Sequence, residues 1–410
     1  MGNTAAHTLE AWTKDLELAQ AAGIDAFVLN MGFADPNISP QVVNAFNAAE
    51  ALGSSFKLLF AFDYRGGGQP WPSGPCGGGF TQCVIGMINK YQGSAAYFKY
   101  KNLPFVSTFE GGTAIDDYAP NGIIRGATGG IYFVPNYDGS GLKVVQNSQA
   151  NIDGIFSWSM WPEGANNKTT SEDFYWKDGL KGKSYMMGVS PWFFHSGEGA
   201  LEPWVWRGDS LWADRWAQTL EVNPEFVQIV TSNDYGEAHY IGPPPLATSE
   251  VPQNSQQYVD GHAHDSWRNF LPYYIASYKG ESFTISKDQL QYWYRTTPKA
   301  GSGNTCNVKG NSPSAGQSVV DVNTIVEDGV FLSALLMDDS DVRVQIGGGS
   351  VTTFQGKKGI NHWSVPFNGQ TGAPVFKVVR SGVTGTGAVI KAKTTLASGC
   401  TNYNAWVGSA

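Results

Sequence analysis

The residues best suited to chemistry lie together at positions 233–240, in the sequence Asn-Asp-Tyr-Gly-Glu-Ala-His-Tyr. This stretch holds the carboxylates of Asp234 and Glu237 and the imidazole of His239, and it follows an apolar, β-branched run at 226–231. Such a run is short enough for a buried strand, and Asn, Asp and Gly then turn the backbone. Neighbouring carboxylates push their pKa values apart, so that one can act as an acid and the other as a base. The stretch therefore predicts an acid/base site at the end of a strand, the alternative being a polar loop that caps the next helix.

The composition favours a surface that binds uncharged sugars. Charged residues make up 15% of the 410 residues, below the roughly 25% of an ordinary globular protein. Aromatic residues reach 13% and include 14 Trp, and the C–H faces of neutral sugar rings pack against such aromatic rings. The net charge of −8 and the lack of a basic run argue against a nucleic-acid partner. No stretch approaches the ~20 consecutive apolar residues that cross a bilayer, so we expect no membrane partner.

The cysteines form two separated sets. Cys76 and Cys83 flank a Gly-rich loop, whereas Cys306 and Cys400 lie near the two ends of the last part of the chain. Each set could form a disulfide, and neither has the spacing of a zinc site. Two Asn-X-Ser/Thr triplets are acceptors for N-glycosylation. These features predict a secreted or cell-wall protein, although the chain opens without a signal peptide.

Around the 233–240 stretch, the chain alternates helix and strand. Short apolar runs predict strands at residues 26–30, 57–63, 104–110, 131–136, 154–158, 185–190 and 226–231. Mostly helical segments separate them, which favours a parallel sheet. A polar or aromatic residue stands at or near the carboxyl end of each strand: Asn30, Asp63, Glu110, Asn136, Trp158, Trp192 and Asp234. This one-sided placement is typical of an α/β fold, the (β/α)8 TIM-like barrel.

One strand of such a barrel is lacking. The chain starts directly before a helix, so we expect the first strand to be missing or truncated, with residues 1–3 as its remnant. From about Glu281, period-two runs such as 375–379 alternate with Gly/Ser/Asn turns, a pattern typical of an all-β domain. The sequence thus predicts a barrel over 1–280 and a C-terminal antiparallel β-sandwich over 281–410.

The chain resembles the fungal α-1,3-glucanases, or mutanases, of glycoside hydrolase family 71. The matching segments are 22–27, 60–64, 106–111, 190–193, 233–240, 264–268 and 292–295, and the likeness covers nearly the whole chain. The resemblance implies a barrel followed by a β-sandwich and the inverting hydrolysis of α-1,3-glucan. Family members carry a leading strand that this sequence lacks. We expect no metal and no cofactor.

The resemblance also implies the roles of the acidic residues. Inversion needs one carboxylic acid and one carboxylate, with roughly 6.5–9.5 Å between them for the attacking water. Asp234 and Glu237 are expected to form this pair, with acid and base left unassigned between them. Asp63, at another strand end, is a third catalytic candidate, which could instead orient water or bind a sugar hydroxyl. We predict that the substrate contacts Asn30, Tyr64, Glu110, Asn136, Trp158, Trp161, Trp192, Asn233, His239 and Tyr240. Core packing is the alternative for the tryptophans.

Two short patterns suggest other chemistry. The tetrapeptide Gly-Asp-Ser-Leu at 208–211 is also found in esterases, but here it precedes a predicted helix, where Asp209 or Ser210 can cap the backbone. No histidine is marked as a partner for a nucleophilic serine. The run His-Ala-His-Asp at 262–265 could suggest a metal site, yet it also precedes a helix, predicted from about Asp265 to Tyr278, that Asp265 can cap.

We therefore expect a secreted, monomeric, endo-acting hydrolase whose partner is an α-1,3-glucan polysaccharide or oligosaccharide. The alternatives are a polysaccharide-binding protein without catalysis and a barrel glycosidase that cleaves another glucan linkage.

Overall fold

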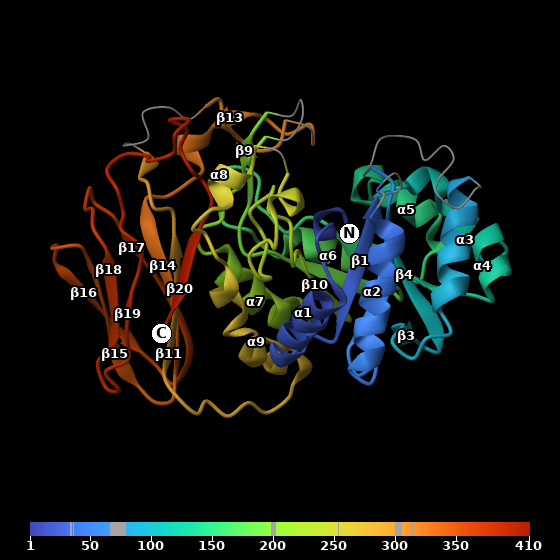
Figure 1. Cartoon of the computed structure of the whole chain (residues 1–410), viewed down its shortest axis with the longest axis horizontal. Helices are drawn as coiled ribbons and strands as arrows, with labels where there is room; N and C mark the ends of the chain where they lie inside the picture. Colours follow the sequence, from blue (N-terminus) through green and yellow to red (C-terminus); the bar gives the residue numbers. More distant parts are fainter. Residues whose placement is uncertain are drawn as a thin grey trace. The chain divides into compact units, whose positions relative to one another are not determined.

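The computed structural model describes residues 1–32, 35, 37–65, 79–197, 202–252, 254–299, 306–313 and 315–410. These residues form two compact units, and Figure 1 labels many of their elements. Unit 1 comprises Met1–Met160, Thr170–Gly188 and Glu221–Gln228. Unit 2 comprises Trp161–Thr169, Val189–Leu220 and Ile229–Ala410. The division into 1–280 and 281–410 stays a prediction.

Unit 1 is built on parallel strands. One sheet pairs, in this order, β1 (Ala26–Gly32), β2 (Lys57–Asp63), β4 (Leu103–Phe109) and β5 (Tyr132–Phe133), with the short β3 (Lys99–Tyr100) antiparallel to β4. A second sheet holds β6 (Gly154–Ser157), β7 (Ser184–Val189) and β10 (Phe226–Ile229). Backbone hydrogen bonds from Asp153 N to Phe133 O and from Phe156 N to Pro135 O, both 2.8 Å, connect the two sheets. The strands thus follow one another in space in the order in which they occur in the chain.

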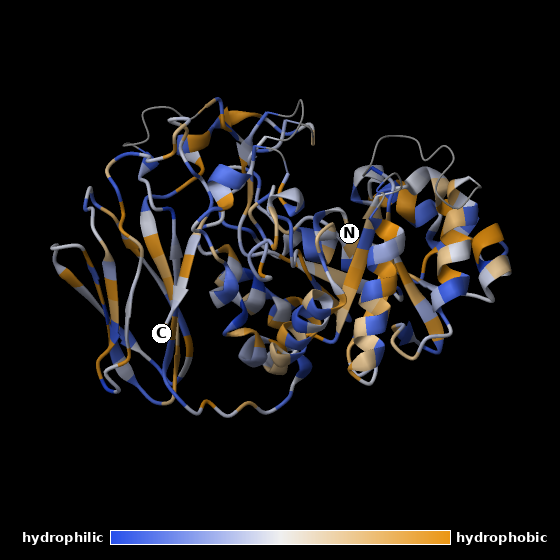
Figure 2. Ribbon diagram, in the orientation of Figure 1, coloured by the Kyte–Doolittle hydropathy of each residue, from blue (hydrophilic) through white to orange (hydrophobic). Residues whose placement is uncertain are grey.

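Helices alternate with these strands, as the sequence predicts. They are α1 (Leu9–Ala21), α2 (Ile38–Ala51), α3 (Phe80–Tyr91), α4 (Ile123–Thr128), α5 (Leu142–Asn147) and α6 (Ser171–Gly179). Thr8 caps α1, because its Oγ1 accepts a hydrogen bond from Ala11 N at 3.2 Å. Trp12 and Leu16 of α1 and Phe46 of α2 are buried in the same apolar core as the strands. Figure 2 shows β1 and β4 as largely hydrophobic, whereas the helices carry both kinds of residue.

Unit 2 contains antiparallel sheets. One sheet has the order β17 (Gly359–Pro366), β14 (Gly329–Leu336), β11 (Gln289–Tyr294) and β20 (Trp406–Ser409). Another has the order β16 (Val351–Gly356), β15 (Ser340–Ile346), β18 (Pro374–Val378) and β19 (Thr384–Thr386). Alternate residues of both sheets, among them Leu332, Val344 and Phe376, share one buried core. Two-residue alternation in the sequence produces this core, since side chains of one strand point to opposite faces.

The rest of unit 2 consists of short elements. A small sheet joins β13 (Val320–Asp321), β12 (Lys309–Gly310), β9 (Trp204–Val205) and β8 (Phe194–His195). The helices are α7 (Leu211–Val222, whose last two residues belong to unit 1), α8 (Gln256–Val259) and α9 (Leu271–Lys279). A disulfide joins Cys306 and Cys400, as predicted. Cys76 lies outside the described residues, so its predicted pairing with Cys83 stays a prediction.

Most predicted strands agree with the observed ones to within two residues at each end, and two predicted elements differ by more. The strand predicted at 131–136 is shortened to Tyr132–Phe133, although Val134 N and Asn136 N still donate to Val106 O and Thr108 O of β4. The single helix predicted from Asp265 to Tyr278 is split into a 3-10 turn, Asp265–Arg268, and α9, which begins with Pro272 in its first turn. Proline suits that position because its N–H would be unpaired there anyway. Within the described ranges, no helix combines the length and the apolar character needed to cross a bilayer.

Candidate active site

The 233–240 stretch forms a loop in unit 2 that follows β10 and is closed by its own hydrogen bonds. Thr231 Oγ1 accepts a hydrogen bond from Asp234 N at 2.9 Å, and Asp234 Oδ1 accepts one from Glu237 N at 3.0 Å. The neighbouring β8 fixes the same loop, because Phe194 N donates to Glu237 O at 2.9 Å. These bonds restrict the backbone from which both carboxylates project.

Asp234, Glu237 and His239 form one cluster at this loop. His239 Nε2 lies 2.8 Å from Glu237 Oε2 and 3.9 Å from Asp234 Oδ2. The His239 side chain is only 1% exposed, whereas those of Asp234 and Glu237 are 34% and 30% exposed. An acid and a base on one face of a fixed loop are therefore within reach of a substrate. Within the part of the chain that the structure describes, Asp234, Glu237 and His239 are also the group that could hold a divalent cation, because their donor atoms lie within 4.8 Å of one another.

The cluster favours protonated forms. Burial raises the pKa of Asp234, and the negative charge of Glu237 raises it further, against the opposing effect of His239. Burial by itself lowers the pKa of His239, but the charges of Asp234 and Glu237 and the hydrogen bond to Glu237 outweigh it, so the pKa is raised. An Asp234 that keeps its proton to a higher pH than usual, beside a partly exposed second carboxylate, is suited to general acid/base chemistry.

Tyr240, the last residue of the loop, is held in place by buried neighbours. Tyr240 is buried, its ring stacks on His264 at 3.9 Å, and its hydroxyl accepts a hydrogen bond from Asn404 Nδ2 at 3.1 Å. The nitrogens of His264 lie 2.9 Å from the carbonyl oxygens of Tyr240 and Ala405. Both ring nitrogens of His264 thus contact the backbone, which explains its burial without a metal. The predicted contact of Tyr240 with substrate, like that of the partly exposed Asn233, stays a prediction.

Two predicted tryptophans lie beneath the cluster. Trp161 and Trp192 are 6% and 3% exposed. Trp161 Nε1 donates to Trp192 O at 2.9 Å, and Trp192 Nε1 donates to Tyr403 O at 2.8 Å. The ring of Trp161 lies 5.4 Å from that of His239. In this conformation the indole of Trp161 packs against His239, and the backbone of Trp192 accepts the Trp161 hydrogen bond. The predicted stacking of both residues on sugars stays a prediction. No pattern in the sequence marked Trp206, a partly exposed residue whose ring stacks on that of Trp161.

The remaining predicted residues lie in unit 1, along the carboxyl edge of its sheet. The pairing Gly32–Asp63, Asp63–Phe109 and the bridge Phe109–Asn136 bring these strand ends side by side. Asn30 Nδ2 donates to Asp63 Oδ2 at 3.3 Å, and Asp63 is partly exposed. The one-sided placement read from the sequence is thus present in these strands.

The other predicted contacts along this edge differ in exposure. Tyr64, Glu110 and Trp158 are partly exposed, whereas Asn136 is buried and donates from Nδ2 to Phe156 O at 3.0 Å. The Tyr64 hydroxyl lies 3.1 Å from that of Tyr118, and burial raises the pKa of Tyr64. The roles of these residues, and a catalytic role of Asp63, stay predictions.

Asp138 is a further acidic residue of this edge that the sequence did not mark. Its Oδ2 accepts a hydrogen bond from Trp158 N at 2.6 Å, so it positions a predicted sugar-contacting residue. Burial raises the pKa of Asp138 to about 7. Asp138 stands two residues after Asn136, the predicted strand end, and this position is the feature of the sequence that could have identified it.

The motifs at 208–211 and 262–265 make contacts that stabilise the fold. Contrary to the sequence prediction, Ser210 does have a histidine partner: its Oγ lies 2.9 Å from His362 Nε2, across 152 residues of chain. The other nitrogen of His362 lies 3.0 Å from Ser333 Oγ. A hydroxyl therefore stands where a nucleophilic triad needs a carboxylate. In the 262–265 run, Asp265 pairs with Arg268 at 2.5 Å.

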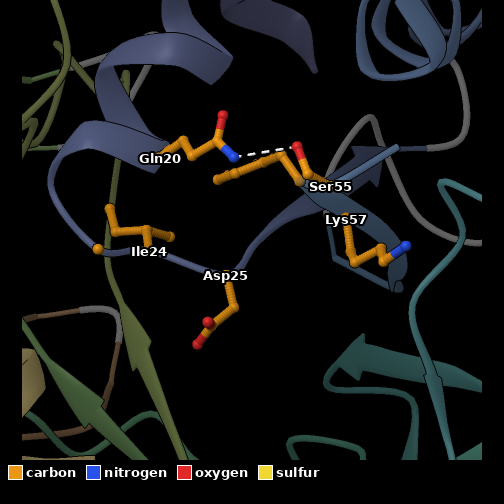
Figure 3. Close-up of a pocket in the computed structure, with 7 residues that line it drawn as sticks. Gln20, Ile24, Asp25, Ser55 and Lys57 are labelled. Atoms are coloured by element: carbon orange, nitrogen blue, oxygen red, sulfur yellow. Dashed lines mark hydrogen bonds between the residues drawn. The ribbon is translucent and has the colours of Figure 1, made fainter. Parts of the chain in front are cut away.

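A cavity of about 360 Å³ lies at the opposite, amino ends of β1 and β2 (Figure 3). Gln20, Asp25, Ser55 and Lys57 line it, and Gln20 Nε2 donates to Ser55 Oγ at 3.0 Å. It offers one carboxylate and no second acid among its lining residues. In parallel α/β folds the chemistry lies at the carboxyl edge, so this cavity is not the candidate site.

Known proteins resemble the whole chain or most of it. Its sequence matches glycosyl hydrolase family 71 over residues 1–410. It is 32% identical over 428 residues to the glucan endo-1,3-alpha-glucosidase agn1 of Schizosaccharomyces pombe, which covers 100% of this chain and 92% of that relative. It is also 32% identical over 416 residues to a mutanase of Penicillium rubens, with 98% and 85% covered. A GH99 endo-alpha-mannosidase from Bacteroides thetaiotaomicron superposes with a TM-score of 0.49 at 14% identity, over 67% of this chain and 80% of that one. The full-length family match and the two relatives show that this chain belongs to glycosyl hydrolase family 71.

Proposed function

We propose that this chain hydrolyses the α-1,3-glucosidic bonds of α-1,3-glucan, as an endo-acting glucan 1,3-α-glucosidase. The observation that carries the proposal is the cluster of Asp234, Glu237 and His239 on one fixed loop of a family 71 chain. The names of the relatives, a glucan endo-1,3-alpha-glucosidase and a mutanase, supply the substrate class.

The two carboxyl groups have different roles in hydrolysis. Asp234, whose pKa is raised, donates its proton to the glycosidic oxygen as the bond to the anomeric carbon breaks. Glu237, which contacts His239, removes a proton from the water that attacks that carbon. Asp234→Asn tests this assignment: it should retain far more activity on glucosyl fluoride, whose leaving group needs no acid, than on the polymer. Equal losses on both substrates would reverse the roles.

Inversion also requires a change in the position of Glu237. One oxygen of each carboxylate lies within 4.8 Å of the other, less than the roughly 6.5–9.5 Å that leaves room for water. Glu237 reaches its carboxylate through rotatable bonds and is partly exposed. We infer that substrate binding turns it away from Asp234. A structure with a bound oligosaccharide in which the pair keeps its present spacing would refute this step.

The architecture and location are part of the proposal. The parallel strands of unit 1 support a (β/α)8 TIM-like barrel, and the two sheets that share a core in unit 2 support a β-sandwich. The disulfide between Cys306 and Cys400 supports a secreted or cell-wall protein, since such bonds persist in oxidising surroundings. We further propose that the chain acts as a monomer. Chemical cross-linking at micromolar concentration that captured a dimer would contradict the last point.

A panel of glucans tests the proposal. Purified protein is incubated with insoluble α-1,3-glucan, starch, β-1,3-glucan and dextran, and new reducing ends are measured. Release from α-1,3-glucan alone is the expected result. Co-sedimentation with α-1,3-glucan without release would instead indicate a binding protein, and release from another polymer would indicate another linkage.

A further inference from the structure

Trp206 combines partial exposure with a fixed orientation. It follows β9, and its ring packs parallel to that of Trp161, with centroids 5.1 Å apart and an interplanar angle of 15°. Phe193 contacts it at 4.2 Å. Trp161 and Phe193 are buried, whereas Trp206 is not. The indole therefore has a rigid support under one face and keeps part of its surface accessible.

The C-terminal part of the chain holds this ring in place. Trp206 Nε1 donates to Gln317 Oε1 at 2.8 Å, and the same oxygen accepts a hydrogen bond from Ser312 N at 2.9 Å. The strand β9 before Trp206 pairs in parallel with β12, in the register Trp204–Lys309 and Val205–Gly310. The segment around β12, which the sequence assigns to an accessory domain, thus fixes the plane of a partly exposed aromatic ring.

The ring is also close to the candidate cluster. Trp161, which supports it, lies 5.4 Å from His239, and Phe193 lies 5.8 Å from the same imidazole. Trp206 and His239 thus both pack against the ring of Trp161, with centroid separations of 5.1 and 5.4 Å. A sugar ring that contacts Trp206 is therefore close to the cluster of Asp234, Glu237 and His239. Trp206 itself is not one of the reacting groups.

We propose that Trp206 is a sugar-binding residue that stacks on a glucose ring of the α-1,3-glucan chain beside the cleaved bond, with Gln317 as its positioning residue. The proposal rests on the proposed function, because it takes the substrate class from there. Neutral sugars bury their C–H faces on indoles, and an indole whose plane is already fixed loses little freedom on binding. Trp206 then contributes binding energy to the ground state and the transition state alike.

This uniform contribution predicts a separation of the kinetic constants. Trp206→Ala should raise KM for long α-1,3-linked oligosaccharides about tenfold, equivalent to roughly 1.4 kcal/mol of binding, and change kcat less than about threefold. The shortest oligosaccharide that is still cleaved should be affected less, because it need not reach the ring. Trp206→Phe should retain most of the affinity, and Gln317→Leu, which removes the acceptor of the indole N–H, should give an intermediate KM.

A matched control separates binding from folding. Trp363 of β17 is also partly exposed and stacks on Phe354 at 5.1 Å and 13°, so Trp363→Ala removes a similar ring pair from the antiparallel sheets. Binding is measured in the Glu237→Gln background by titration of long oligosaccharides, and melting temperatures check the fold. The expected result is weaker binding with Trp206→Ala and unchanged binding with Trp363→Ala.

The outcomes distinguish this proposal from the proposed function. If the unaltered chain cleaves α-1,3-glucan while Trp206→Ala leaves KM and oligosaccharide binding unchanged, the stacking role is wrong and the function stands. If the chain binds the oligosaccharides without cleaving them, the hydrolase proposal is wrong, and the loss of binding with Trp206→Ala still supports the stacking role. A chain that neither binds nor cleaves α-1,3-glucan refutes both.

Discussion

Replacing His239 with glutamine should slow hydrolysis and change its dependence on pH. In the structure, the nearly fully buried imidazole lies 2.8 Å from Glu237 and 3.9 Å from Asp234. Glutamine keeps a polar side chain of similar size but cannot carry the positive charge. The substitution therefore removes the charge from the cluster with little change in packing volume.

The expected size of the effect comes from the lost contact. A hydrogen bond to a charged group contributes about 1.5–3 kcal/mol, so kcat should fall about 10- to 150-fold if that contact acts in the transition state. His239 also lowers the pKa of Asp234, so its removal should raise that pKa further. With Asp234 as the acid, the alkaline limb of kcat/KM then moves to higher pH.

The assay follows reducing ends released from a soluble α-1,3-linked oligosaccharide between about pH 3 and 9, a span chosen to bracket the ordinary pKa values of Asp and His. His262→Gln is the matched control, since His262 is a partly buried histidine of the same unit whose imidazole contacts Asp260 O and Asn402 Nδ2 and neither carboxylate of the cluster. Circular dichroism and the melting temperature establish that each variant is folded. An unchanged kcat together with an unshifted alkaline limb for His239→Gln would refute the role of His239.

Three further predictions concern stereochemistry and stability. Proton NMR of the first products should show the β-anomer, the outcome of inversion at an α-bond; the α-anomer would instead fit the short spacing of Asp234 and Glu237. Burial raises the pKa of Asp209 to about 7 although Arg207 lies 3.2 Å away. The folded chain therefore keeps a proton that the unfolded chain loses above about pH 3.9. The free energy of unfolding should consequently fall by up to about 4 kcal/mol between about pH 4 and 7. Denaturant titrations should show that Asp209→Asn removes this slope, whereas parallel curves for both chains would contradict it. Replacing Cys306 and Cys400 with serine opens a crosslink between residues 94 positions apart and should lower the free energy of unfolding by about 2–5 kcal/mol. An unchanged denaturation midpoint would contradict this prediction.

Local patterns in the sequence predicted the strands and helices well where the pattern itself determines the structure. The apolar run at 57–63 gives β2 with the same bounds, because a short buried strand needs no partner to be recognised. The Cys306–Cys400 disulfide follows from the division of the four cysteines into two separated sets. The helix predicted from Asp265 to Tyr278 was wrong in its extent, since periodicity does not reveal where a 3-10 turn ends and Pro272 begins a new helix.

Long-range packing determined what the sequence could not predict. Trp161 and Trp206 are the same residue type and stack on each other, yet Trp161 is buried against His239 and Trp206 is partly exposed. The contact between Ser210 and His362 joins two elements 152 residues apart, so no local pattern indicates it. The raised pKa of Asp138 likewise depends on its burial, which its position after a strand does not reveal. Composition predicts that aromatic rings bind sugar, but only the fold selects which ring is accessible.

The central claim is that Asp234 and Glu237 catalyse the cleavage of α-1,3-glucan. Its most direct test is the turnover of Asp234→Asn and Glu237→Gln on this substrate, beside the unaltered chain, with each variant shown to be folded. Removing a general acid or base should lower kcat by about 10²- to 10⁴-fold in both. A folded Glu237→Gln variant with near-normal turnover would contradict the account.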